Sequence, residues 1–313
     1  MVKIAVIGAG HVGATTALML AQRNLGKIVL LDIATGTPEG TSLDISESGP
    51  VLRFESRVCG TEDYADIAGA RIAIVTACSP RKPGMSRMDL LAVNAAVVSD
   101  TAQQIARHAP EAILVVVTNP LDVMCHVAWK ASGFPKRRVM GMAGVLDSSR
   151  FRHFIAEELG VAVEDTQAMV LGGHGDSMVP LARYATVSGI PIEQLLLPEA
   201  IARLIERTRG GGTEIVNLLK TGSAYYAAAA GITQMVEAIV LDSQRLLPAS
   251  VRLEGEYGLG DIFLGVPIIL GGHGVERIVE IKLTAMERQA LKQSAQDVRH
   301  GIQAWEENPG GPF

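Results

Sequence analysis

The residues best suited to chemistry in this chain are a histidine, an aspartate and an arginine. His174 lies in the glycine-rich run 171–176, Leu-Gly-Gly-His-Gly-Asp, and Asp147 and Arg150 precede it on a predicted helix. An imidazole titrates near neutral pH and can exchange a proton with a hydroxyl group if a carboxylate such as Asp147 holds its ring in one tautomer. Arg150 follows Asp147 at the i+3 spacing that puts both on one helix face, and a guanidinium can bind a carboxylate through two hydrogen bonds. Because a histidine in a glycine-rich turn is more often structural, the rest of the chain must decide whether this set is a proton-transfer site.

A glycine-rich motif near the start of the chain is typical of a dinucleotide site. It follows an apolar run at residues 3–7, opens a predicted helix over residues 12–24, and consists of Gly8, Ala9, Gly10, His11, Val12 and Gly13. Such glycines allow a tight turn, a close approach of the backbone to a pyrophosphate, and packing of helix against strand. Asp32 ends the second predicted strand, where its carboxylate can accept hydrogen bonds from a ribose diol and repel a 2′-phosphate. We therefore expect NAD in preference to NADP. His11 either reaches a phosphate or has no role.

Further polar residues follow the fourth and fifth predicted strands. Residues 80–87 read Pro-Arg-Lys-Pro-Gly-Met-Ser-Arg, so Arg81 and Arg87 share a loop at the carboxyl end of the sheet, where such folds bind ligands. The two arginines could close over a small anion, and an ordinary charged surface loop is an equal alternative. Asn119 follows the next strand, where its amide can serve cofactor and substrate. The Asn119-Pro120 bond is a candidate cis peptide.

The elements that must position these residues change in pattern near the middle of the chain. Short β-branched runs alternate with helical segments up to about residue 143, and they predict strands at 3–7, 28–31, 57–59, 72–76, 113–117 and 139–142. Several runs are continuously apolar, as in strands buried on both faces, which predicts an α/β fold with a Rossmann-type doubly wound parallel sheet.

The second half of the chain predicts an α+β arrangement. We expect helices at 147–159, 198–219, 223–241 and 284–305, with strands near 168–171 and 182–187 and further short strands before the last helix. The change of pattern predicts two domains, an NAD-binding domain at 1–145 and a substrate-binding, catalytic α+β domain at 146–313.

Composition and charge exclude several classes of protein. The 313 residues are 48% hydrophobic and 19% charged, which fits two domains with buried cores. The net charge of -5 and the lack of a basic tract argue against a nucleic-acid partner. The apolar runs are far shorter than the roughly 20 residues that span a bilayer, and no cleavage-like site follows the first one. Cys59, Cys78 and Cys125 form neither an even disulfide framework nor a Cys-x-x-Cys motif, so we expect a cytoplasmic protein with no metal site.

Together these residues resemble the lactate/malate dehydrogenase family, from Gly8 to about Ile281. The resemblance is closest to its malate-specific members with lactate dehydrogenase architecture, and it rests on the motifs at 80–87, 144–147 (Gly-Val-Leu-Asp), 172–176 and 220–226 (Lys-Thr-Gly-Ser-Ala-Tyr-Tyr). It implies reversible oxidation of (S)-malate to oxaloacetate with hydride transfer to NAD. It also implies a homodimer or homotetramer that associates through the helix at 38–48, which carries Leu43 and Ile45.

The resemblance further implies a role for each site residue. His174 would be the proton acceptor with Asp147 behind it, and Arg150 would bind the C1 carboxylate. Arg87 would polarise the reacting oxygen, and Arg81 would bind the distal carboxylate. The residues implied to contact the cofactor are those of the glycine motif with Asp32, Asn94, Val117, Thr118 and Asn119; Asn94 and Asn119 would also contact the substrate. The Asn119-Pro120 bond is expected to be cis.

Three alternatives and four departures accompany this prediction. A lactate or other 2-hydroxy acid dehydrogenase differs by one charge in the pocket, an NAD-dependent glycoside hydrolase would need a metal, and an NAD sensor would not need His174 with three arginines. Cys125-His126 falls on an apolar helix and is expected in the core. Cys78 and Ser79 stand where the family has Gly and a small residue, Ala228 replaces a Pro and His273 a Gly. Cys78 is expected to be a buried thiol, and it would weaken NAD binding if its backbone needed a positive φ.

Overall fold

The first half of the molecule is built on six parallel strands. The structure, a computed structural model, describes residues 1–78 and 87–307. The strands are β1 (Lys3–Ile7), β2 (Lys27–Leu31), β3 (Val58–Thr61), β4 (Ile72–Val75), β5 (Ile113–Val116) and β6 (Val139–Gly141). Their order is β3-β2-β1-β4-β5-β6, so the chain reverses direction across the sheet between β1 and β4. The predicted doubly wound sheet is confirmed, and ligands bind such sheets at the carboxyl ends of the strands beside this reversal.

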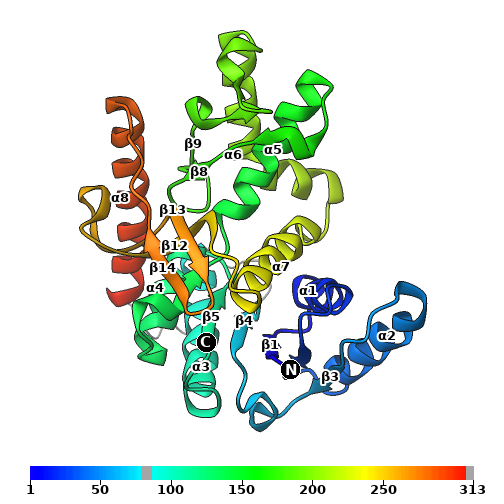
Figure 1. Cartoon of the computed structure of the whole chain (residues 1–313). Coiled ribbons are helices and arrows are strands. Elements are labelled where there is room, and N and C mark those ends of the chain that lie inside the picture. Colours follow the sequence, from blue (N-terminus) through cyan, green and yellow to red (C-terminus); the bar gives the residue numbers. More distant parts are fainter. Residues whose placement is uncertain (79–86, 308–313) are drawn as a thin grey trace.

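Helices cover the sheet and explain its continuous apolar strands. Every residue of β4 and β5 is buried, as expected for strands covered on both faces. The helices are α1 (His11–Gln22), α2 (Thr37–Leu52), α3 (Arg87–His108), α4 (Leu121–Ser132), α5 (Gly144–Leu159), α6 (Pro198–Leu219), α7 (Tyr226–Val240) and α8 (Ala285–Glu307). Helix α4 packs against α3 and α8, whereas α7 packs against α1 and α5 (Figure 1). Helix α5 begins three residues before its predicted start, and α7 begins three residues after its predicted start.

The second half differs from the short strands predicted for it. Strands β12 (Arg245–Glu254) and β13 (Gly260–Gly271) are long and antiparallel, and with β14 (Gly274–Ile278) they continue the sheet beyond β6. The described residues thus form a nine-stranded mixed sheet. The sequence obscured these strands because Pro248 and Pro267 interrupt their apolar runs, and a proline inside such a run argues against a central strand.

The segment between α5 and α6 contains only two-residue strands. They are β7 (Thr166–Gln167), β8 (Val170–Leu171), β9 (Val179–Pro180), β10 (Thr186–Val187) and β11 (Ile190–Pro191). The strand predicted at 182–187 is wrong over its first half, where residues 182–184 form a 3₁₀ turn. Ser188 and Gly189 then take positive φ values of 46° and 84°, the conformation of a tight β10–β11 hairpin turn.

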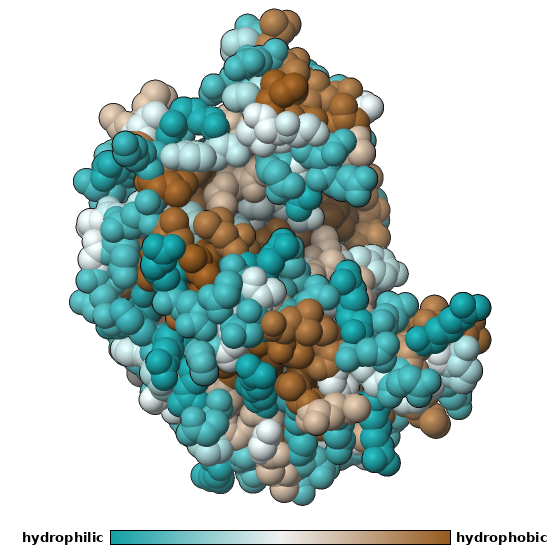
Figure 2. Space-filling view, in the orientation of Figure 1, coloured by the Kyte–Doolittle hydropathy of each residue, from teal (hydrophilic) through white to brown (hydrophobic). Residues whose placement is uncertain are grey.

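The buried side chains form a large core around the main sheet and a smaller one around α5. The smaller core includes Phe151, Ile155 and Leu204 and joins α5 to α6. Hydrophilic residues cover much of the face in Figure 2, and hydrophobic residues form separate patches on it. Within the described ranges, every helix is too short or too polar to cross a membrane.

Candidate active site

The loop that carries His174 is fixed to the main sheet by its backbone. Gly172, with a φ of +88°, exchanges two backbone hydrogen bonds with Gly265 of β13, at 2.9 and 3.1 Å. A Cβ at Gly265 would lie 2.4 Å from the Gly172 carbonyl oxygen, so this approach needs glycine. The next N–H, of Gly173, donates to Ser294 Oγ at 2.8 Å. The histidine therefore stands on a loop tied to β13 and α8.

His174, Asp147 and Arg150 meet as their spacing predicted. His174 Nδ1 lies 2.8 Å from Asp147 Oδ2, and Arg150 Nη1 donates to Asp147 Oδ1 at 3.3 Å. The side chains are 16%, 3% and 13% exposed, respectively. Because the carboxylate accepts from Nδ1, the imidazole keeps Nε2 available for proton exchange with a bound hydroxyl. The structure brings these three side chains together, and their catalytic roles stay a prediction.

The surroundings of His174 favour its charged form. Burial is the largest influence and lowers its pKa, but the charge and hydrogen bond of Asp147, with the charge of Asp122, raise it by more. The Arg150 guanidinium acts in the opposite direction. The net result is a pKa above the usual value of 6.5, so protonated His174 persists to a higher pH than a free imidazole does.

Arg150 packs against a run of glycines in α6. A Cβ at Gly211 would lie 3.1 Å from Arg150 Cδ and 3.5 Å from Nε, whereas a Cβ at Gly210 would meet no heavy atom within 4 Å. Arg150 Nε is buried and has no hydrogen-bond partner among the described residues. A buried donor without a partner is costly, and the guanidinium still has its terminal nitrogens with which to bind a ligand carboxylate.

The predicted glycine motif has the geometry that a dinucleotide requires. Gly8 has a φ of +105°, and a Cβ at Gly13 would lie 1.8 Å from the Gly8 carbonyl oxygen. Gly10 precedes α1, and open space surrounds its Cβ position. Among the described residues, no side chain caps the first turn of α1, which leaves its backbone N–H groups facing the loop. These features fit a pyrophosphate held by backbone donors.

The other residues of the motif differ in exposure and contacts. Asp32 accepts the backbone N–H of Ala9 at 2.5 Å and that of Ala34 at 3.0 Å, so its carboxylate lies beside the glycine turn. Ala9 is buried and Val12 is half-buried. His11 is exposed, and its ring stacks on Tyr225 with 5.0 Å between ring centroids. This aromatic partner could not be read from the sequence.

Predicted site residues form hydrogen bonds around the carboxyl ends of β4 and β5. Thr118 Oγ1 donates to the Ala77 carbonyl at 2.7 Å, and buried Asn94 donates to the Asn119 carbonyl at 2.9 Å. Val117 is half-buried, Asn119 is exposed, and the Asn119-Pro120 bond is cis, which confirms that expectation. Arg81 lies outside the described residues, as does the side chain of Arg87, at whose position α3 begins.

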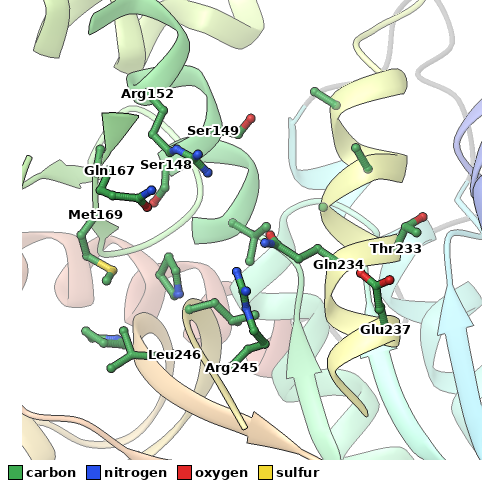
Figure 3. Close-up of a pocket in the computed structure, with 18 of the residues that line it drawn as sticks. Ser148, Ser149, Arg152, Gln167, Met169, Thr233, Gln234, Glu237, Arg245 and Leu246 are labelled. Atoms are coloured by element: carbon green, nitrogen blue, oxygen red, sulfur yellow. The ribbon is translucent and has the colours of Figure 1, made fainter. Parts of the chain in front are cut away.

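A separate pocket of about 810 Å³ lies on the opposite face of α5. Figure 3 shows Ser148, Ser149 and Arg152 of α5 across from Gln234 and Glu237 of α7. Its lining includes none of the predicted site residues whose side chains the structure describes. Two of its polar groups already have partners, since Ser148 Oγ accepts the Val170 N–H at 3.0 Å and Glu237 pairs with Arg23 at 3.1 Å. The pocket is therefore distinct from the site around His174.

Comparison with known proteins identifies the family. The model of the lactate/malate dehydrogenase NAD-binding domain matches residues 2–141, and that of the lactate/malate dehydrogenase alpha/beta C-terminal domain matches residues 144–308. The chain belongs to the lactate/malate dehydrogenase family. The malate dehydrogenase of Desulforudis audaxviator is 54% identical to it over 297 residues, which are 95% of this chain and 96% of the relative.

Solved structures of the family have the same fold. A malate dehydrogenase from Salinibacter ruber superposes with a TM-score of 0.94 at 48% identity, over 98% of each chain. A lactate dehydrogenase from Cryptosporidium parvum, solved with lactic acid and the nicotinamide cofactor, also has a TM-score of 0.94, at 42% identity over 97% of this chain and 98% of that one. The fold alone therefore does not separate the two substrates.

Three residues that depart from the family pattern, Cys78, Ala228 and His273, lie where the structure accommodates them without backbone strain. Cys78 is exposed, so the expectation of a buried thiol is wrong. Its φ is not positive, so the side chain causes no backbone strain of the kind considered for this position. His273 is exposed in the β13–β14 turn and Ala228 is buried in α7. As predicted, Cys125 and His126 are buried in α4.

Sequence reasoning missed Asp122, a buried acid in the first turn of α4 that accepts the His174 backbone N–H. It also missed Ser250, Ser294 and Gly211, which contact the site from β12, α8 and α6. One signal was available in the sequence, namely an acid among the apolar residues of the first turns of α4, directly after Asn119-Pro120.

Proposed function

We propose that the chain catalyses the reversible oxidation of (S)-malate to oxaloacetate with NAD. The observation that carries this proposal is the cluster in which Asp147 lies 2.8 Å from the His174 ring and 3.3 Å from Arg150. It combines a proton carrier with a carboxylate-binding group, as oxidation of a 2-hydroxy acid requires. The similarity to proteins named malate dehydrogenase, 54% identical over 95% of this chain, supports malate as the acid.

Each residue of the cluster has one task in this reaction. Arg150 binds the C1 carboxylate and so directs the C2 hydroxyl toward His174. The glycine motif and Asp32 would hold NAD, which when bound would supply the acceptor for the hydride from C2. His174 Nε2 takes the hydroxyl proton as the C2=O bond forms, and Asp147 stabilises the resulting imidazolium. In the direction of reduction, protonated His174 returns that proton to the oxygen.

The choice of malate over lactate rests on Arg81. Malate and oxaloacetate carry a second carboxylate, for which Arg81 supplies the counter-charge, while Arg87 polarises the C2 oxygen. The resemblance in residues 80–87 supports both assignments. Lactate and pyruvate would leave Arg81 without a partner.

The preference for NAD rests on Asp32. Its carboxylate, held by two backbone N–H groups beside the glycine turn, can accept the ribose hydroxyls and repels a 2′-phosphate. Domains at 1–145 and 146–313 are supported by the separate family models for residues 2–141 and 144–308. A cytoplasmic location is supported by the three cysteines, each of which is unpaired.

Assembly into a dimer or tetramer is proposed through α2. Leu43 supports it, because this side chain is 61% exposed on that helix. Ile45, which was expected beside it, is 7% exposed and belongs to the core. Of the two residues named from the sequence, Leu43 is therefore the one that can contribute to a contact surface on α2.

Replacing His174 tests the reaction and its proton carrier together. Asparagine keeps a polar side chain of similar reach but cannot carry a proton, and a positioned acid/base typically contributes about 10²–10⁴-fold. We expect His174→Asn to lower kcat for malate-dependent NAD reduction by that factor while NADH still binds, as measured by quenching of protein fluorescence. His153→Asn is the control, because His153 lies on the same helix as Asp147 and makes no contact with the cluster that we describe. Full turnover by His174→Asn would refute the proposed role.

A further inference from the structure

Asp122 is a second carboxylate at His174, and it contacts the backbone of that residue, whereas Asp147 contacts its ring. Its side chain is 4% exposed, and both of its oxygens accept hydrogen bonds. Oδ2 accepts the His174 backbone N–H at 2.8 Å, and Oδ1 accepts the Ser250 hydroxyl at 2.6 Å. A carboxyl group that accepts at both oxygens has the pattern of its ionised form.

The packing leaves no room between Asp122 and the catalytic loop. A Cβ at Gly173 would lie 3.3 Å from Asp122 Oδ2 and 2.9 Å from Val298, so a larger residue would push the loop off the carboxylate. Among the described charged groups, Asp122 is the one that faces His174 from α4, and Asp147 and Arg150 face it from α5. Asp122 is itself faced by His174, Asp147 and the Ser250 hydroxyl, with Cys125 beside it on α4.

A neutral side chain holds the same loop one residue earlier, by the same kind of hydrogen bond. Ser294 Oγ accepts the Gly173 N–H at 2.8 Å and lies 3.1 Å from Ser177 Oγ. Holding the loop therefore does not require a charge. Burying a carboxylate is costly, and burial does raise the pKa of Asp122, against the effects of Ser250 and the His174 N–H. The need to hold the loop therefore does not explain why the residue at position 122 carries a charge.

We propose that Asp122 is a positioning residue that fixes the His174 loop through Oδ2 and whose negative charge stabilises the protonated imidazole. It acts through His174 and does not touch the substrate. The inference rests on the proposed role of His174 as proton carrier. Asp147 and Asp122 then share one function, since together they outweigh the burial that disfavours the imidazolium.

Asp122→Asn separates the charge from the geometry. The amide oxygen can still accept the His174 N–H, and the amide nitrogen can donate to Ser250 Oγ, so the shape is kept. Without the charge, the protonated imidazole is less stable and its pKa falls. For oxaloacetate reduction, which needs protonated His174, the alkaline limb of kcat/KM should move to lower pH by about one unit, a roughly tenfold loss above that limb. For malate oxidation, which needs neutral His174, the acid limb should move down equally.

Ser294→Ala is the matched control. It removes the neutral anchor of the same loop, so it should lower kcat at every pH and leave both limbs in place. The double variant Asp122→Ala with Ser250→Ala also removes the charge and should shift the limbs as Asp122→Asn does. The second substitution is included because Ser250 would otherwise keep a buried hydroxyl without its acceptor. Unmoved limbs in both variants that lack Asp122, or an equal shift in Ser294→Ala, would overturn this inference alone. A wild-type enzyme without oxaloacetate activity would overturn the proposed function as well.

Discussion

At the scale of single residues, the charge of Asp32 should set the choice of cofactor. Asp32→Ser removes the repulsion of a 2′-phosphate, and the hydroxyl can still accept one of the two backbone N–H groups that hold the carboxylate. We expect the ratio of kcat/KM for NADP to that for NAD to rise on the order of tenfold or more, which corresponds to about 1.4 kcal/mol. Asp63→Ser, in the turn after β3, is the control and should leave the ratio unchanged. An unchanged ratio in Asp32→Ser would make Asp32 a bystander.

Residues with a local signature were the ones that could be predicted. His174, Asp147 and Arg150 combine chemical type with short-range spacing, and Gly8 and Gly13 lie in a motif whose purpose is steric. Asp122 has a weaker signal, an acid among apolar residues directly after Asn119-Pro120, and no spacing that relates it to His174. Its partner lies 52 residues away, and nothing in an apolar helix indicates which distant loop its first turn will contact.

At the scale of elements, α6 provides a test of how Arg150 is seated. Gly211→Ala would bring a methyl group to 3.1 Å from Arg150 Cδ, so the guanidinium must shift, whereas Gly210→Ala adds its methyl to open space. Both substitutions favour the helix by about 1 kcal/mol, because glycine is a poor helix former. We expect Gly211→Ala to raise KM for oxaloacetate on the order of tenfold, as a partly lost charge-assisted bond would, with KM for NADH unchanged. Gly210→Ala should leave both KM values unchanged. Equal kinetics in the two variants would mean that the glycine does not seat Arg150.

The secondary-structure elements were predicted where the hydrophobic pattern of the sequence is uniform over the whole element. The parallel strands are short and continuously apolar, so they were found nearly in full. Strands β12 and β13 were not predicted at their full length, because a proline interrupts the apolar run of each. Strand β12 also pairs with β6, which is distant in the sequence. Only the tertiary structure shows that Ser250 of β12 pairs with Gly141 of β6 and so reaches Asp122.

At the scale of the whole molecule, we expect assembly through α2. Light scattering at micromolar concentration should give two or four times the chain mass of 33.1 kDa. Leu43→Glu puts a charge on the exposed face of α2 and should lower that mass, because a buried unpaired charge disfavours association. Met286→Glu, which changes an exposed residue at the start of α8, is the control and should not lower it. A wild-type mass near 33.1 kDa would contradict the assembly.

The substrate itself is the central claim, and the ratio of kcat/KM for oxaloacetate to that for pyruvate, with NADH, tests it most directly. With pyruvate, Arg81 would be desolvated without a counter-ion, a cost of several kcal/mol that amounts to discrimination on the order of 10³-fold. We predict that the wild type prefers oxaloacetate by that factor. We also predict that Arg81→Gln loses most of the preference, by depressing kcat/KM for oxaloacetate and raising it for pyruvate, with KM for NADH unchanged. A wild type that prefers pyruvate, or an Arg81→Gln variant that keeps the wild-type ratio, would contradict the account.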